Sequence, residues 1–191
     1  MKALEEKILR EGQVFPGEIL KVGSFLNQQV DVEFLNEMGE EIHRLFKDSG
    51  VTKVLTVEAS GIVVAYAAAS KMGVPMVFAK KHQSLNLSSD LLKSSVFSFT
   101  HKKTYDIVVS REFIKEDDVI LIVDDFLAKG NALIGLINLV ESAGAKVAGA
   151  AIAIEKGFQE GGEMIRKRGI RVESLAIIDS MTDNSITFRE Q

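Results

Sequence analysis

Two adjacent carboxylates, Asp124 and Asp125, are the residues of this sequence best placed to do chemistry. They follow the apolar run 119–123, which is predicted to be a buried strand. A loop of small residues, 128–132, comes next and leads into an apolar-periodic segment that is predicted to be a helix. A helix start offers free N–H groups and a positive dipole end to a phosphate. Because the acids lie within reach of sugar hydroxyls or a divalent cation, the motif predicts a sugar-phosphate site.

The elements around this motif predict an α/β fold in which helices flank a parallel central sheet. Helical spacing from 35 to 46, with Asp31 as N-cap, indicates one helix. Because strands and helices alternate, the strands are expected to be parallel and covered on both faces. Strands are predicted at 53–57, 75–79, 119–123, 146–154 and 172–178, and further helices at 61–70, 131–143 and 162–168.

Polar residues follow four of these predicted strands. They are 58–61, Lys80 with Lys81, the acid pair, and 155–156. Since ligands of such sheets bind at the carboxyl ends of the strands, we expect these segments to converge on one site. The segment 83–115 interrupts the alternation; 96–100 and 105–109 are suited to an antiparallel hairpin. A long insertion beside a catalytic edge is often a lid.

The composition limits the classes of function. The 191 residues fit one domain, 1–191, without a linker or repeat. The net charge of −4 argues against a nucleic-acid partner. The absence of cysteine excludes disulfides and thiolate chemistry, and the three histidines lack zinc-ligand spacing. A charged start and no long apolar run indicate neither a signal peptide nor a membrane partner, so a cytoplasmic location is expected.

The motif from 119 to 133 resembles the signature of the phosphoribosyltransferase family, type I: an apolar strand, two acids, a small-residue loop and a helix. The resemblance extends from about residue 20 to 179. It implies pentosyl transfer, in which ribose 5-phosphate passes from phosphoribosyl pyrophosphate (PRPP) to a nitrogenous base. The segments 20–29 and 154–159 resemble the base-recognition segments of bacterial members that use xanthine. The implied function is therefore purine salvage, with xanthine and PRPP as substrates and xanthosine 5-monophosphate as product.

The resemblance also implies roles for individual residues. Asp124 and Asp125 would be catalytic, facing the ribose hydroxyls and stabilising positive charge on the ring as pyrophosphate departs. The PRPP-binding residues would be Ala128, Lys129, Gly130, Asn131 and Ala132 at the 5-phosphate, with Glu58, Ala59, Ser60 and Lys81 at the pyrophosphate. His82, Lys102 and Lys103 are further basic candidates near the pyrophosphate.

The phosphate loop departs from the commoner family pattern. Lys129 and Ala132 stand where many members have threonine, and Asn131 stands where glycine is frequent. The charge of Lys129 is expected to replace the lost hydroxyl donors. Relatives acting on oxo purines often have an aspartate at the position of Ala128, so the acceptor of the purine proton is unassigned.

The base-binding residues implied by the resemblance are Leu20, Asn27, Lys156 and Phe158. Phe158 would stack on the purine, Lys156 would donate to a ring carbonyl oxygen, and Asn27 would donate and accept. A small hood over the base, a flexible lid and a homodimer are also implied. Mg²⁺ would arrive with PRPP, without a dedicated metal site in the protein.

Several alternatives remain open at this stage. Leu20 and Phe158 also suit plain core packing, Lys129 suits a solvated loop, and 58–61 suits an ordinary strand–helix turn. The base could instead be guanine, hypoxanthine or adenine, although an edge donor such as Lys156 favours an oxo purine. A regulator that binds PRPP without turnover is the alternative from another class; such proteins carry an added DNA-binding module, for which the segment before Leu20 is too short.

Overall fold

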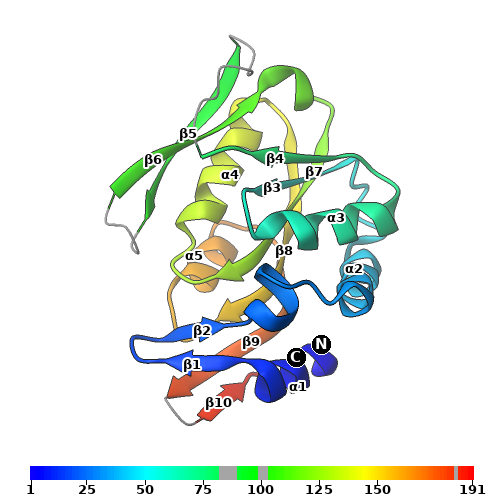
Figure 1. The fold of residues 1–191 in the computed structure, drawn as a ribbon. Helices are drawn as coiled ribbons and strands as arrows, with labels where there is room; N and C mark the ends of the chain where they lie inside the picture. Colours follow the sequence, from blue (N-terminus) through cyan, green and yellow to red (C-terminus); the bar gives the residue numbers. More distant parts are fainter. Residues whose placement is uncertain (82–89, 99–102, 183–184) are drawn as a thin grey trace.

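A six-stranded sheet organises the protein in a computed structural model, which describes residues 1–81, 90–98, 103–182 and 185–191 (Figure 1). The strand order is β10-β9-β8-β7-β3-β4. Neighbouring strands from β9 to β4 are parallel, and only β10 pairs antiparallel. The predicted α/β class with a parallel sheet is confirmed. The strands are β3 (Lys53–Val57), β4 (Met76–Ala79), β7 (Val119–Leu127), β8 (Lys146–Lys156), β9 (Val172–Thr182) and β10 (Ser185–Phe188).

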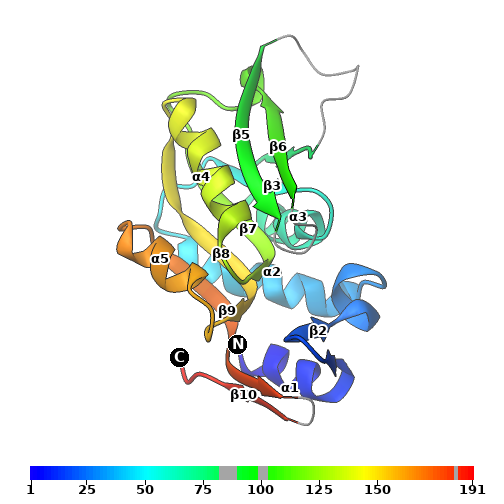
Figure 2. The same ribbon diagram turned by 90° about the vertical axis from the view of Figure 1, so that its left-hand side faces the viewer.

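Helices cover both faces of this sheet (Figures 1 and 2). On one face lie α1 (Lys2–Glu11), α2 (Val32–Phe46) and α3 (Gly61–Met72), and on the other lie α4 (Asn131–Ser142) and α5 (Gly161–Lys167). Strand β7 alternates between the two cores, with Leu121 and Val123 packed in one and Ile120 and Ile122 in the other. Burial on both faces explains its continuous apolar run.

Helix α2 begins where the sequence predicts. The side chain of Asp31 accepts a hydrogen bond from the backbone N–H of Phe34 at 3.1 Å, which is the expected N-cap. None of the helices that the structure describes is long and apolar enough to cross a membrane. Since both cores share one sheet, the organisation is as expected for a single domain, which stays a prediction.

Two hairpins lie outside the sheet. The first, formed by β1 (Gln13–Phe15) and β2 (Ile19–Lys21), leads into a π-helical turn, Gly23–Asn27. Its strands were not predicted, although its position over the end of β8 suits the expected hood (Figure 1).

The second hairpin, β5 (Leu91–Ser98) with β6 (Lys103–Ser110), confirms the predicted antiparallel pair, with Val96 opposite Tyr105. A 3₁₀ turn, Arg111–Phe113, follows it. The hairpin packs on α4 so closely that a Cβ at Gly135 would lie 2.5 Å from a methyl of Val96. Of the predicted lid segment, residues 83–89 and 99–102 lie outside the described residues, as do the candidates His82 and Lys102.

Candidate active site

The acid pair lies within strand β7. The sequence had suggested a position after the end of that strand. The backbone of β7 continues to pair with β8 as far as Leu127. Asp124 is buried, and its Oδ1 accepts a hydrogen bond from the backbone N–H of Asp125 at 3.0 Å. The first turn of α3 rests against it, because a Cβ on Gly61 would lie 2.7 Å from that Oδ1 and 2.4 Å from Thr56 Oγ1. Only glycine permits this close approach.

Both acids are harder to ionise than ordinary aspartates. Burial raises the pKa of Asp124 well above its usual range, and the charge of Asp125 raises it further. Burial also raises the pKa of Asp125, against hydrogen bonds from Asp124 and from the side chain of Asn27. Within the described part of the chain, no lysine or arginine forms an ion pair with either carboxylate. The pair is therefore suited to a ligand that brings or develops positive charge.

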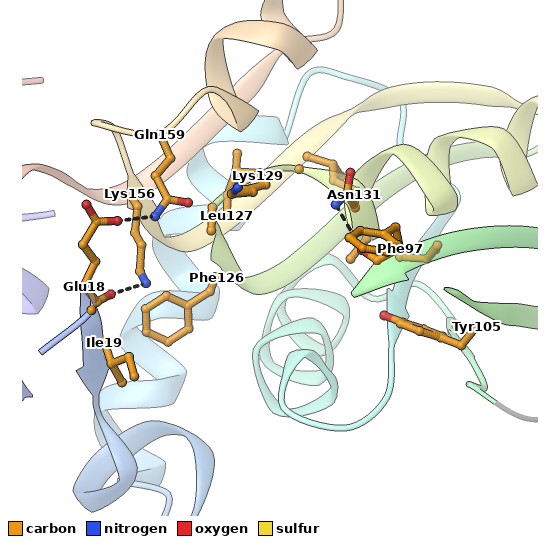
Figure 3. Close-up of a pocket in the computed structure, with 16 residues that line it drawn as sticks. Glu18, Ile19, Phe97, Tyr105, Phe126, Leu127, Lys129, Asn131, Lys156 and Gln159 are labelled. Atoms are coloured by element: carbon orange, nitrogen blue, oxygen red, sulfur yellow. Dashed lines mark hydrogen bonds between the residues drawn. The ribbon is translucent and has the colours of Figure 1, made fainter. Parts of the chain in front are cut away.

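A cavity of about 580 Å³ opens beside the loop that follows the acid pair (Figure 3). All five residues of 128–132 line it, so the structure brings the predicted phosphate loop together around one space. Lys156 lines the same cavity from the end of β8. The other walls come from the two hairpins, through Gly17, Glu18, Ile19, Val96, Phe97 and Tyr105, and from Phe126, Leu127, Leu133 and Gln159.

The loop 128–132 packs against the first residue of helix α5. The backbone N–H of Gly161 donates to the carbonyl oxygen of Ala128 at 3.1 Å. A Cβ on Gly161 would lie 2.2 Å from that oxygen and 2.7 Å from the backbone nitrogen of Gly130. Gly130 itself has a left-handed conformation, with φ of 81°, which glycine adopts at little cost. The loop therefore depends on glycine at both positions.

Asn131 connects the phosphate loop to the second hairpin. Its side-chain amide donates to the carbonyl oxygen of Phe97 at 3.0 Å (Figure 3). Asn131 is also the first residue of α4, and the first N–H groups of that helix have no acceptor within the helix. The amide thereby fixes β5 beside the helix terminus.

The predicted pyrophosphate loop follows β3, the strand that pairs with β7. Glu58 Oε1 accepts a hydrogen bond from the backbone N–H of Lys81 at 2.6 Å. The Lys81 ammonium lies 5.8 Å from the ring centroid of Tyr105, and its charge acts to lower the pKa of Asp124. Lys81 thus carries positive charge into the site.

Ala59 and Ser60 line a separate, smaller cavity of about 140 Å³. Asn27 lines it as well, and its side chain reaches Asp125 from there. The predicted pyrophosphate loop and this predicted base residue therefore lie together, in a cavity separate from the one that the phosphate loop lines.

The predicted base residues occupy different environments. Lys156 Nζ donates to the backbone carbonyl of Glu18 at 2.7 Å, and burial lowers the pKa of this ammonium. Leu20 is buried in the core and follows Ile19, which lines the main cavity. Phe158 packs against the core and does not belong to the lining of that cavity. Phe126 presents an aromatic ring there instead (Figure 3).

Ten residues that line the cavity were not among the predicted site residues. A local signal existed for four of them, since Phe126, Leu127 and Leu133 lie within the motif 119–133 and Gln159 ends the segment 154–159. Val96, Phe97 and Tyr105 lie in the segment expected to be a lid, but no individual role was predicted for them. Gly17, Glu18 and Ile19 arrive on the N-terminal hairpin, and no pattern near the acid pair points to them.

A metal ion would find only part of its ligands here. In the regions that the structure describes, no group of three or more His, Cys, Asp or Glu side chains could hold one. The adjacent carboxylates can supply oxygen ligands, which suit Mg²⁺, but a full octahedral shell needs oxygens from substrate and water. The residues present therefore fit a metal that arrives with a phosphorylated ligand.

An acid-bearing strand followed by a small-residue loop and a helix is the arrangement expected of a sugar-phosphate site, and comparison with known proteins specifies the class of protein. Residues 26–181 match the phosphoribosyl transferase domain family, so the chain belongs to the phosphoribosyltransferase family. This confirms the resemblance drawn from the motif at 119–133.

Two relatives carry the name xanthine phosphoribosyltransferase. One, from Lachnoclostridium phytofermentans, is 54% identical over 99% of this chain and 98% of its own length. The other, from Ruminiclostridium cellulolyticum, is 52% identical over the full length of both. This chain also resembles the crystal structure of adenine phosphoribosyltransferase from Thermoanaerobacter pseudethanolicus. The match includes 91% of this chain and 98% of that one, with a TM-score of 0.74 and 22% sequence identity. At that identity the likeness concerns the fold.

Proposed function

We infer that this enzyme is a purine salvage phosphoribosyltransferase that converts xanthine and PRPP to xanthosine 5-monophosphate and pyrophosphate. The observation that carries this is identity of 54% and 52%, over essentially whole chains, to xanthine phosphoribosyltransferases. The gathering of the motif residues 128–132 and Lys156 around one cavity supports it.

The reaction exchanges one bond for another at ribose C1. The C–O bond to pyrophosphate breaks, pyrophosphate leaves with the electron pair, and a purine nitrogen forms the new C–N bond while losing its proton. Positive charge develops on the ribose between these events. We propose that Asp124 and Asp125 bind the ribose hydroxyls and stabilise that charge. The absence of an ion pair to either carboxylate among the described residues favours this role.

The phosphates are assigned to two loops. We propose that the amides of Ala128 to Ala132 bind the 5-phosphate at the start of α4, with Lys129 adding a charge. Residues 58–60 and Lys81 would bind the pyrophosphate on the opposite side of the acid pair. Holding both ends of PRPP fixes C1 between them, and such positioning is a large part of the catalysis of group transfer.

The base is assigned to the hood side of the cavity. We propose that Lys156 donates to a purine carbonyl oxygen and that Asn27, at Asp125, binds the other edge. Leu20 and Phe158 were proposed as apolar contacts; their packing here supports a role in shaping the hood. Phe126 is an additional candidate to face the ring.

Mg²⁺ is proposed to enter with PRPP. It would neutralise the charge of the departing pyrophosphate, and the acid pair would supply it with protein oxygens. A homodimer and a cytoplasmic location are also proposed. The exposed Tyr66 on α3 and Phe78 on the edge strand β4 provide apolar surface for a second copy, and light scattering tests the dimer.

Product formation from PRPP with a panel of purines tests the proposed function. We expect the largest kcat/KM with xanthine, lower values with guanine and hypoxanthine, and the lowest with adenine. A clear preference for adenine would overturn the assignment of the base. PRPP binding without turnover of any purine would favour a regulator instead.

A further inference from the structure

The turn of the N-terminal hairpin contains an unusual backbone conformation. Glu18 has a φ of 61°, in the left-handed region that glycine adopts far more easily. The preceding Gly17, with φ of 84°, has the same handedness, and for a glycine this is unremarkable. A non-glycine residue held in this region needs a compensating interaction, and such residues gather at ligand sites.

Both the backbone and the side chain of Glu18 accept hydrogen bonds, from the last residue of β8 and from the turn that follows it. Its carbonyl oxygen accepts from Lys156 Nζ at 2.7 Å, and its carboxylate accepts from Gln159 Nε2 at 2.9 Å (Figure 3). The charge of Glu18 also favours the protonated form of the half-buried Lys156. These two contacts join residues 138 and 141 positions apart in the wall of the main cavity.

The contact with Gln159 determines which way its amide faces. An ionised carboxylate only accepts hydrogen bonds, so the nitrogen of the Gln159 amide must face Glu18. The amide oxygen then lies on the opposite side, as Figure 3 shows, and Gln159 lines the cavity. A fixed acceptor thus accompanies the fixed donor of Lys156.

We propose that Glu18 is a positioning residue for base specificity, which orients Lys156 as a donor and Gln159 as an acceptor toward the purine edge. An oxo purine presents a carbonyl oxygen beside a ring N–H, which matches this donor and acceptor. Adenine presents an amino donor beside an unprotonated ring nitrogen, which reverses the pattern. A site that leaves buried polar groups unpaired discriminates strongly against the wrong base.

This inference rests on the proposed function, and steady-state kinetics of four variants test it. Glu18→Gln removes the charge that fixes the Gln159 amide, so that this amide can rotate. Gln159→Met removes the amide itself. The variant that combines Glu18→Gln with Gln159→Met completes a double-mutant cycle. Glu18→Gly removes the carboxylate but relieves the backbone of the turn. Glu160→Gln, an exposed neighbour that loses the same charge, is the matched control.

We expect each single variant to raise the KM for xanthine by roughly three- to tenfold, the loss of one hydrogen bond, and to leave the KM for PRPP and kcat within about twofold. The double variant should show little more than either single one. Glu18→Gly should also keep or raise the thermal midpoint, because glycine suits the turn. A role in the turn alone would not move the xanthine KM in this way.

An unchanged xanthine KM in Glu18→Gly and Glu18→Gln would overturn the inference, as would additive effects in the double variant or equal losses for PRPP. Calorimetric binding of xanthosine 5-monophosphate, compared between wild type and variants, gives the same test without turnover. Wild-type preference for another oxo purine would contradict the proposed function alone. The KM for that base would then be compared between the wild type and the same variants. Preference for adenine would contradict both.

Discussion

Two buried acids on neighbouring strands have opposite environments. Glu155 on β8 is 2% exposed, and both its oxygens accept from Arg166 at 2.7 Å, with a further hydrogen bond from the Ser174 hydroxyl. Burial acts to raise the pKa of Glu155, but these donors outweigh it and the pKa is lowered. Asp124 on β7 is 7% exposed and has no such cation among the described residues, so burial raises its pKa.

The difference separates a structural acid from one suited to a ligand. The charge of Glu155 is satisfied within the protein and stabilises the fold. The charge of Asp124 is offset only in part, by Lys81 and the Asp125 N–H, so it costs stability in the free enzyme, as strained or destabilising residues at functional sites often do. Two adjacent glycines of α5 lie against these two different parts of the protein. Gly161 supports the loop that follows β7, while a Cβ on Gly162 would lie 1.9 Å from Glu155 Oε1.

Asp124→Asn is the most direct test of the difference between Asp124 and Glu155. The amide keeps the acceptor for the Asp125 N–H but removes the charge. We expect kcat to fall by about 10²–10³, the usual cost of losing one group that stabilises transition-state charge. Stability should change in the opposite direction. Because the folded-state pKa is raised, ionisation destabilises the native protein as pH rises through that pKa.

The thermal midpoint of Asp124→Asn should therefore exceed that of wild type at pH 8, and the gain should disappear as acid protonates Asp124. Asp117→Asn, on an exposed turn, is the control and should change neither property. A variant that is both inactive and less stable at pH 8 would show that Asp124 is structural.

Arg166→Met tests the other half of the comparison. It leaves the buried charge of Glu155 without its cation, and such a loss costs about 3 kcal/mol of unfolding free energy. The folded-state pKa of Glu155 is lowered in wild type, so this stability is present above the ordinary glutamate pKa and is lost as pH falls through the folded value. Denaturant unfolding in a pH series from 7 downward should show a large deficit at pH 7 that shrinks as the pH falls through the lowered folded-state pKa. Arg168→Met is the exposed control; a deficit that does not change with pH would contradict the ion-pair account.

Lys129→Ala sharpens the assignment of the phosphate loop. If Lys129 replaces the missing hydroxyl donors, its loss should raise the KM for PRPP by the equivalent of about 1.5–3 kcal/mol and change the KM for xanthine little. Lys115→Ala, at an exposed position away from the cavity, is the control. An unchanged KM for PRPP would mean that Lys129 does not contact the phosphate.

The paired variants Gly161→Ala and Gly162→Ala should separate activity from stability. Each added methyl costs roughly 1–3 kcal/mol of overpacking. In Gly161→Ala the strain falls on backbone atoms of the loop 128–132, so the KM for PRPP should rise. In Gly162→Ala it falls on Glu155 and Arg166, so the unfolding free energy should drop with nearly normal kinetics. Equal effects of both variants would show that α5 does not divide the two functions.

Much of the fold was predictable because apolar periodicity is local. Strand β3 has the predicted bounds, and β8 and β9 only extend beyond theirs. Strand β7 was predicted too short because the acid pair interrupts its apolar run. Backbone pairing is indifferent to that change, and Phe126 still pairs with Ile154. The N-terminal hairpin was missed because three-residue strands carry no periodicity.

The site was predictable where one contiguous motif forms it. Residues 124–132 lie together in sequence, and their loop lines the cavity as expected. The remaining walls depend on contacts between distant segments, such as Lys156 with Glu18 and Gly161 with Ala128. No spacing in the sequence encodes such contacts, and so neither Gly161 nor the cavity residues of the N-terminal hairpin were anticipated, whereas the second hairpin was expected only as part of a lid beside the site.

A crystal structure with xanthosine 5-monophosphate tests the central claim most directly. The account predicts that the phosphoryl group is bound by the backbone amides of 128–132, that the ribose hydroxyls face Asp124 and Asp125, and that the base reaches Lys156. A phosphoryl group bound elsewhere, with the loop at 128–132 empty, would contradict it.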